Sequence, residues 1–195
     1  MKAFRRVSAP VAVLDRADVD TDQIIPKQFL KRIERTGYGE FLFFDWMKDP
    51  AFPLRQPEAQ GASILVAGRN FGCGSSREHA AWALEDFGIR IVLAPSFGDI
   101  FRSNAVNAGL APIVLGAEEL AAVRDAVADM NELTVDLEQL VISHPGGLRV
   151  SFPFDAYAQE TLVHGLDAVA RTLQREDEIA AYEASHAPRV DALAL

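Results

Sequence analysis

The chain has 195 residues, of which 49% are hydrophobic and 24% charged, and its formal net charge at pH 7 is −9. This composition is that of a globular protein rather than a disordered one, and the length suits one sizeable domain. The negative charge excludes a broad nucleic-acid-binding face and disfavours attachment to an anionic membrane, because both need clustered lysine and arginine.

The chain has a single cysteine, Cys73, which excludes an intramolecular disulfide and fits a reducing compartment. The N-terminal apolar stretch is too short, and too soon followed by acidic residues, to be a signal peptide. No run approaches the roughly 18 apolar residues of a membrane-spanning helix. The sequence therefore predicts a soluble cytoplasmic protein.

The first third of the chain is irregular. Residues 7–14 predict a strand, which the acidic loop 15–22 follows. The aromatic run 41–46 comes after a glycine turn and indicates a short buried helix. Three prolines make residues 49–61 a loop.

From residue 64 onward, strands and helices alternate. The sequence predicts strands at 64–67, 90–94 and 112–115, separated by helices at 77–87 and 99–108 that end at Gly88 and Gly109. This alternation favours β-α-β units and a parallel sheet, and hence an α/β fold.

The last third begins with an acidic amphipathic helix at 117–130. A hairpin of strands 134–143 and 148–152 follows, and then an acidic helical segment at 160–183. We expect a single domain over residues 1–183 and a flexible tail over 184–195.

Residues 68–79, with the sequence GRNFGCGSSREH, carry the strongest chemical signal. Glycines allow sharp turns and close approach to a ligand. Ser75 and Ser76 then open a helix whose N-terminal N–H groups attract anions, and Arg77 offers a bidentate fork for a carboxylate. The pattern predicts a site for a small anion.

A structural interpretation of the same residues competes with this one. Ser75 and Glu78 have the spacing of a capping box, so the serine would only satisfy a free backbone N–H. Three common motifs are excluded: Arg77 stands at the third glycine position of a dinucleotide fingerprint, and neither a P-loop nor a G-x-S-x-G elbow occurs.

Two other features admit chemistry. Cys73 is a candidate nucleophile beside His79, but one cysteine cannot hold an iron–sulfur cluster, and the four histidines lack metal-ligand spacing. The acidic stretch 18–22 lacks the glycine and the distal glutamate of a calcium loop. It either caps the next helix or supplies a carboxylate that orients a neighbouring catalytic group.

These segments resemble the small subunits of isopropylmalate dehydratase, which are related to the fourth domain of aconitase. The resemblance covers roughly residues 5–183 and rests on DTDQIIPK at 20–27, FDW at 44–46, NFGCGSSREH at 70–79, APSFGDIF at 94–101 with Asn104, GLD at 165–167 and TLQ at 172–174. It implies a swivelling β/β/α domain with a parallel sheet core, as in the aconitase C-terminal domain.

The resemblance also implies a hydro-lyase that isomerises 2-isopropylmalate to 3-isopropylmalate by dehydration and rehydration, in leucine biosynthesis. It implies that this chain holds no cofactor or metal. A large subunit would complete a heterodimer or higher assembly and carry a [4Fe–4S] cluster.

Carried over residue by residue, the catalytic base of the superfamily falls on Ser75. A helix N-terminus and Arg77 would stabilise its alkoxide. Arg77 would hold a substrate carboxylate, with Gly74 and Ser76 beside it. Asp22 matches an aspartate that orients a histidine of the partner chain.

The resemblance places the recognition of the variable substituent after residue 26. Phe29 and Leu30 would suit an isopropyl group by hydrophobic contact, although they also fit the core of a short helix. Lys31 and Arg32 follow closely and could bind a third carboxylate, so a tricarboxylate substrate remains an alternative.

Several alternatives therefore stay open. Hydration of citraconate to 2-methylmalate, or hydration of homoaconitate, keeps the chemistry and changes the substrate. A non-catalytic binding module and an independent thiol enzyme using Cys73 change the class of function.

Overall fold

The computed structural model describes residues 1–31 and 35–186. The expectation for Arg32, and most of that for the C-terminal tail, lie outside these residues. The chain divides into two compact units, Met1–Gly165 and Leu166–Leu195. No helix within the described ranges is long and apolar enough to cross a membrane.

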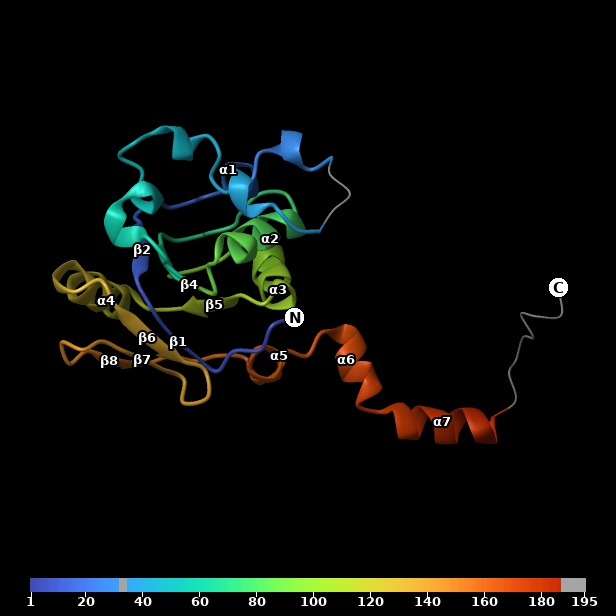
Figure 1. Ribbon diagram of the computed structural model, residues 1–195. Coiled ribbons are helices and arrows are strands. Elements are labelled where there is room, and N and C mark those ends of the chain that lie inside the picture. The colour runs from blue at the N-terminus through green and yellow to red at the C-terminus, as the bar shows by residue number, and fades with distance from the viewer. Residues whose placement is uncertain (32–34, 187–195) are drawn as a thin grey trace. The chain divides into compact units, whose positions relative to one another are not determined.

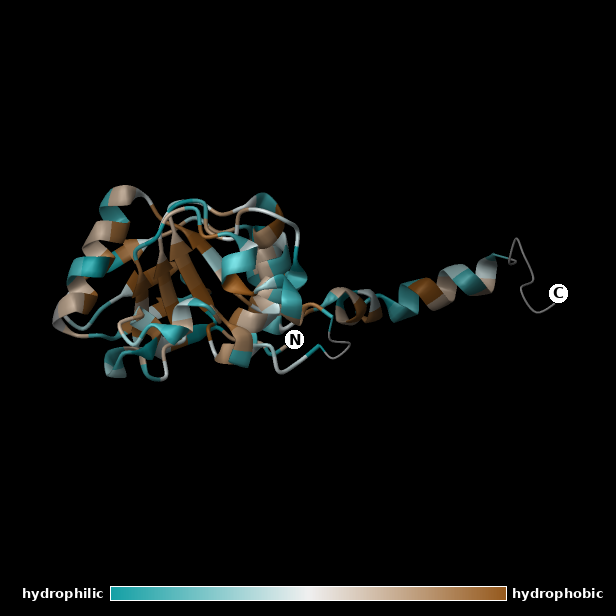
Figure 2. Cartoon of the chain, turned by 90° about the horizontal axis from the view of Figure 1, so that it is seen from above, coloured by the Kyte–Doolittle hydropathy of each residue, from teal (hydrophilic) through white to brown (hydrophobic). Residues whose placement is uncertain are grey.

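A parallel four-stranded sheet lies at the centre of the first unit (Figure 1). Its strands, in spatial order, are β2 Val11–Leu14, β3 Ile64–Ala67, β4 Ile91–Ala94 and β5 Ala111–Val114. The strands are apolar throughout because both faces of the sheet are covered, and Figure 2 shows them as a hydrophobic band inside the unit. The predicted parallel sheet and α/β class are confirmed.

Alternate residues of the sheet face two separate cores. One core packs against α2 Glu78–Phe87, α3 Asp99–Ala108 and the irregular segment 38–62. The other core packs against α4 Ala117–Asp129, a second sheet and α5 Ala156–His164. The result is the layered β/β/α arrangement that the resemblance implied.

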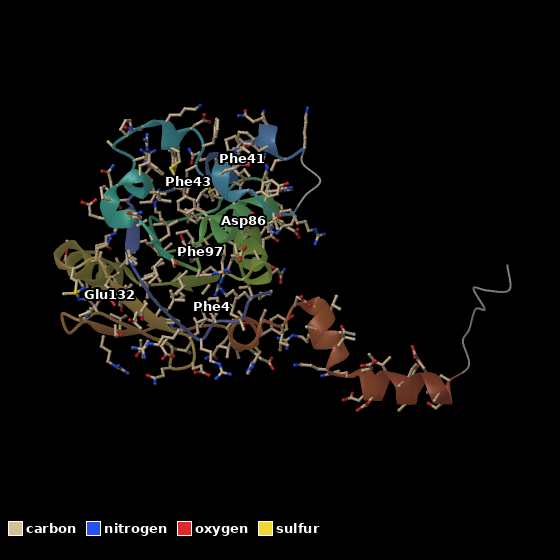
Figure 3. The ribbon with its side chains drawn as sticks, viewed as in Figure 1. Phe4, Phe41, Phe43, Asp86, Phe97 and Glu132 are labelled. Carbon is tan, nitrogen blue, oxygen red and sulfur yellow. The ribbon has the colours of Figure 1, made fainter. Side chains whose placement is uncertain are left out.

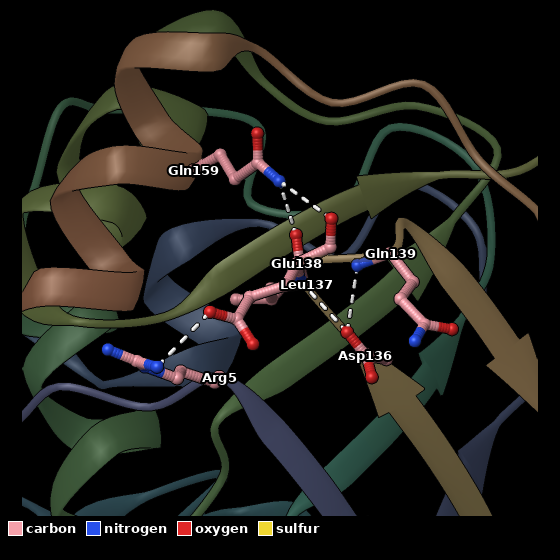
Figure 4. A network of polar contacts seen from close by, with 6 residues as sticks. All are labelled: Arg5, Asp136, Leu137, Glu138, Gln139 and Gln159. Atoms are coloured by element: carbon pink, nitrogen blue, oxygen red, sulfur yellow. Dashed lines mark hydrogen bonds and ion pairs between the residues drawn. The ribbon is translucent and has the colours of Figure 1, made fainter.

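The second sheet is antiparallel. Its order is β1 Arg6–Ala9, β6 Leu133–Asp136, β7 Val141–Ser143 and β8 Arg149–Ser151. A polar network at one end ties α5 to the β6–β7 turn (Figure 4): Gln159 Nε2 donates to Leu137 O at 2.5 Å, and Arg5 Nη1 lies 3.3 Å from Glu138 Oε1. Asp136 Oδ1 accepts two backbone N–H groups of the same turn, at 3.0 and 2.8 Å.

Two predicted strands are each divided in the structure. The strand expected at 7–14 is interrupted at Pro10, so that β1 joins the antiparallel sheet and β2 the parallel one. Proline has no N–H to continue a ladder, which makes it a natural place to change sheets. The strand expected at 134–143 turns at Leu140, whose φ is 54°, and becomes β6 and β7.

The aromatic segment 41–46 is not the predicted helix. It lies between two 3₁₀ turns, η2 Gly39–Phe41 and η3 Trp46–Lys48, around Phe43 at φ 47°. The proline-rich stretch contains two further turns, η4 Pro53–Arg55 and η5 Pro57–Ala59. Tyr38 N–H donates to Asp86 Oδ2 at 2.8 Å and ties this segment to α2. Figure 3 labels Phe41 and Phe43 of the segment and Asp86 of α2.

The segment 160–183, predicted to be helical, contains parts of three helices. The first is α5, which ends at Gly165 with φ 68°. The second unit holds the other two, α6 Ala168–Leu173 and α7 Glu176–Ser185, and neither of them contains a buried residue.

Candidate active site

Loops that follow β2, β3 and β4 meet at the carboxyl edge of the parallel sheet. Gly72 N–H donates to Val19 O at 2.7 Å, and Phe71 N–H donates to Ser96 O at 3.0 Å. Isolated parallel bridges, Asp20 with Cys73 and Phe71 with Phe97, extend the sheet pairing into these loops. In open α/β sheets, ligands bind outside the carboxyl ends of the strands, so the glycine-rich segment lies where a site is expected.

Packing fixes the course of the glycine-rich segment. Gly72 has φ +75°, and a Cβ built there would overlap the Phe101 ring. A Cβ at Gly98 would lie 2.6 Å from Gly72 O. Glycine is therefore required in both loops, because their backbones touch each other and α3.

Ser75 and Ser76 lie in an exposed bend that precedes α2. The helix begins at Glu78 with Arg77 as its N-cap residue, and no side chain caps it. The capping-box interpretation of Ser75 and Glu78 is therefore wrong, and so is the expectation that the serines open the helix. Within the described chain, the Ser75 hydroxyl makes no hydrogen bond, so it is available to a ligand.

Thr21, which sequence reasoning did not single out, is hydrogen-bonded to the backbone of the loop that carries Ser75. It is buried, with 2% of its surface exposed. Its Oγ1 donates to Ser75 O at 2.9 Å, and its N–H donates to Cys73 O at 3.0 Å. Two hydrogen bonds from one residue thus fix the backbone that presents Ser75.

The structure brings Asp22 and Arg77 together, although they are 55 positions apart. Arg77 Nη1 donates to Asp22 Oδ1, and Nη2 donates to Oδ2 at 3.2 Å, which makes a bidentate pair. The Arg77 hydrogen bond, with a smaller contribution from Lys27, holds the pKa of the Asp22 carboxyl below its usual range. The fork predicted to bind a substrate carboxylate is occupied by the chain's own carboxylate.

The acidic stretch divides its two expected roles between different residues. Asp20 is the N-cap of α1 Thr21–Ile24 and forms a capping box with Gln23, with Asp20 Oδ1 accepting from Gln23 N–H at 2.8 Å. Asp18 accepts from Asn70 Nδ2 at 2.9 Å and pairs with Arg69 at 3.1 Å, which joins the loops after β2 and β3. Asp22 alone of the three carboxylates faces Arg77.

The surroundings of Cys73 do not activate a thiol. Burial raises the pKa of the Cys73 thiol, and the carboxylates of Asp20 and Asp18 raise it further. His79 packs against Trp82 at 4.7 Å and Tyr38 at 5.2 Å between ring centroids, and burial lowers its pKa. No hydrogen bond in the described chain joins Cys73 to His79. A reactive cysteine needs a lowered pKa, which argues against the thiol-enzyme alternative.

Phe29 and Leu30 come from the short turn that begins at Lys27, the residue that helps to lower the pKa of Asp22. Phe29 ends η1 Lys27–Phe29, stacks on Phe41 at 4.2 Å and meets Phe44 edge-on at 4.8 Å. Both residues are half-buried and pack against the core. Both residues therefore contribute to the core and also keep part of their surface accessible.

The described residues contain no group of three or more His, Cys, Asp or Glu side chains able to hold a metal. With Cys73 the single cysteine of the sequence, these residues do not fit a resident iron–sulfur cluster.

Comparisons with known proteins identify relatives over nearly the whole chain. The family model of the Aconitase C-terminal domain matches residues 1–118. The 3-isopropylmalate dehydratase small subunit of Koribacter versatilis is 54% identical over 196 residues, covering 96% of this chain and all of that protein. The 3-isopropylmalate dehydratase small subunit of Bacillus subtilis is 50% identical over 190 residues. This match covers 94% of this chain and 96% of that protein.

A solved structure extends the comparison to the fold. The crystal structure of 3-isopropylmalate dehydratase from Methanocaldococcus jannaschii is similar with a TM-score of 0.66 and 26% identity. The match covers 91% of this chain and 99% of that one. The chain belongs to the family of 3-isopropylmalate dehydratase small subunits, hydro-lyases of the aconitase superfamily that serve leucine biosynthesis.

Proposed function

We propose that this chain supplies half of the active site of a 3-isopropylmalate dehydratase, which isomerises 2-isopropylmalate to 3-isopropylmalate by dehydration and rehydration. The small-subunit name of its relatives implies a large-subunit partner. The observation that supports the proposal best is the position of Ser75, exposed on a fixed loop at the carboxyl edge of the parallel sheet, two residues from Arg77.

In this proposal Ser75 is the base that removes the proton alpha to a substrate carboxylate. A serine hydroxyl is a weak base at neutral pH, so its alkoxide needs neighbouring positive charge. Arg77 and the free N–H groups at the start of α2 supply that charge. The hydrogen bond from Thr21 Oγ1 to Ser75 O limits how far the loop can move.

Arg77 binds a substrate carboxylate, with Ser76 and Gly74 alongside. Asp22 occupies this fork in the free chain, so the carboxylate must displace Asp22 or share the remaining N–H donors. Asp22 is 52% exposed and free to move into solvent, whereas the Arg77 side chain is 15% exposed and needs a carboxylate partner, so the substrate carboxylate would replace Asp22 in that role. A displaced Asp22 is free to orient a histidine of the large subunit, the role the resemblance gives it.

We assign the [4Fe–4S] cluster, a Lewis acid, to the large subunit of a heterodimer or higher assembly. This chain has one cysteine, fewer than the three or four ligands of a cluster, and its described part has no group of side chains able to hold a metal. A cytoplasmic location stays a prediction, consistent with an unpaired thiol.

The half-exposed Phe29 and Leu30 favour a substrate with an apolar branch. An isopropyl group would be held by hydrophobic contact with them. Homoaconitate would instead require a cation, for which the exposed Lys31 is a candidate. Assays with substrates in parallel separate these possibilities.

The experiment is an anaerobic hydratase assay that follows the unsaturated intermediate by ultraviolet absorbance. The chain is tested alone and with its reconstituted large subunit, on 2-isopropylmalate, 2-methylmalate and citrate. We expect activity only in the mixture, and highest with 2-isopropylmalate. An intact complex with its cluster in place but no hydratase activity would contradict the proposal.

A further inference from the structure

The C-terminal unit carries apolar side chains that remain exposed. Val169 and Leu173 on α6 are 68% and 59% exposed, and Ile179 and Tyr182 on α7 are 40% and 62% exposed. The spacing within each pair, four residues on α6 and three on α7, places both members on one side of their helix. Each pair therefore forms a small apolar patch on its helix, and on α7 this patch lies between Glu178 and Glu183.

The face of α7 continues to its C-terminal end. His186 stacks on Tyr182 with ring centroids 4.0 Å apart and an interplanar angle of 15°. Ile179 and Tyr182 thus have the i, i+3 spacing of a helix that binds in a groove of a partner, and the C-cap residue His186 covers one face of the Tyr182 ring. We call these five residues, Val169, Leu173, Ile179, Tyr182 and His186, the C-terminal face.

Helix α7 needs such a partner for its stability. It has ten residues, none of them buried. Isolated helices shorter than about 12–15 residues are marginal in water, because nucleation is costly and packing normally supplies the stability. The free energy that keeps α7 helical must therefore come from a surface that covers the C-terminal face.

The relatives indicate which partner this is. The Aconitase C-terminal domain model ends at residue 118. The match to the Koribacter versatilis small subunit leaves only 4% of the chain unmatched, about 8 of its 195 residues, so it includes most of residues 166–195. The unit is thus shared with proteins that work as separate small subunits. Without a covalent linker to raise its local concentration, a subunit must hold its partner through its own surface.

We propose that α6 and α7 dock on the large subunit, with the C-terminal face in an apolar groove that has a basic rim. The basic rim follows from the acidic residues of α7, which are Glu176, Asp177, Glu178 and Glu183. The inference rests on membership in the small-subunit family and is independent of the chemistry of Ser75.

The test measures the Kd of the full-length chain for the reconstituted large subunit by analytical ultracentrifugation. The first variant is the double change Ile179→Asp with Tyr182→Asp, and the second is Val169→Asp with Leu173→Asp. Tyr157→Asp, at an equally exposed tyrosine of α5 (56%), is the matched control. We expect each double variant to weaken binding at least about tenfold, with Tyr157→Asp within about twofold of the parent.

Three outcomes would overturn the proposal. The first is unchanged binding by both double variants, or equal weakening by Tyr157→Asp. The second is a lower Tm of the variant chain alone, which would show that the face packs within its own chain. The third is a lost self-association with an unchanged Kd for the large subunit, which would show that a second copy covers it.

Docking and catalysis are separated by one further comparison. At saturating large subunit the docking variants should recover turnover, whereas Ser75→Ala should bind normally and stay inactive. A Ser75→Ala chain that retains turnover would remove the proposed base and leave docking intact.

Discussion

The loops of the candidate site and the C-terminal unit are opposites in how they are held. The loops carry little regular structure, yet their backbones are fixed by hydrogen bonds from three segments and by Gly72 against the Phe101 ring. The described part of the C-terminal unit, residues 166–186, is mostly helical, yet neither α6 nor α7 contains a buried residue. Regular secondary structure is thus no measure of how firmly a segment is held.

This difference has a functional meaning. A catalytic loop must hold its groups in place before substrate arrives, because misplacement by about 1 Å can cost 10²-fold in rate. A docking segment can become ordered only when its partner binds, and the binding free energy then offsets the loss of conformational entropy. On the two proposals made above, the chain fixes its catalytic loop by itself, whereas its C-terminal face becomes covered only on assembly.

The largest expected effect is on turnover, from Ser75→Ala. Alanine cannot take a proton, so kcat of the assembled enzyme should fall by about 10²–10⁴, the usual contribution of a general base. The unfolding free energy should not change, because Ser75 caps no helix. Ser76→Ala is the neighbouring control and should act mainly on KM. A kcat that falls no more for Ser75→Ala than for Ser76→Ala would place the base elsewhere.

The next largest effect tests the packing of the loop. Gly72→Ala should lower the unfolding free energy by about 1–2 kcal/mol for its positive φ and by a further 1–3 kcal/mol for the clash with Phe101. Gly61→Ala is the matched control, because Gly61 has the same φ of +75° and a Cβ added there would meet nothing within 4 Å. Urea unfolding of both variants separates the clash from the backbone strain, and equal losses would show that Phe101 does not hold the loop.

A smaller effect is expected from Thr21→Val, which keeps the shape and removes the hydroxyl. Losing the hydrogen bond to Ser75 O should cost about 0.5–1.5 kcal/mol of stability. If Thr21 positions Ser75, kcat should also fall while KM for the substrate stays unchanged. Thr21→Ser retains the donor and should restore kcat. A kcat equal to that of the parent in Thr21→Val would limit Thr21 to a structural role.

Sequence reasoning succeeded where local signals decide the structure. The buried strand 64–67 and the helix 99–108 were predicted with the bounds observed, because an apolar run and a terminal glycine mark them. The break at Pro10 was missed, since the change of sheet depends on which neighbour each half of the strand finds. Thr21 was missed for a related reason. Its hydrogen-bond partner Ser75 lies 54 positions away in the sequence, and no local sequence pattern predicts a contact over that separation.

The smallest effect is the pH dependence of the Asp22–Arg77 pair, in which Asp22 has a pKa below its ordinary value of 3.8. A depressed carboxyl pKa stabilises the folded state above pH 3.8, and this contribution is lost as the pH falls through the folded pKa. Asp22→Asn should therefore cost about 0.2–1 kcal/mol at pH 7, since Asp22 is half-exposed, and progressively less below pH 3.8. Urea unfolding of parent and variant from pH 7 to pH 3 measures this difference. A difference that stays constant across the range would show that the ion pair does not stabilise the free chain, and that Arg77 is already available to a substrate carboxylate.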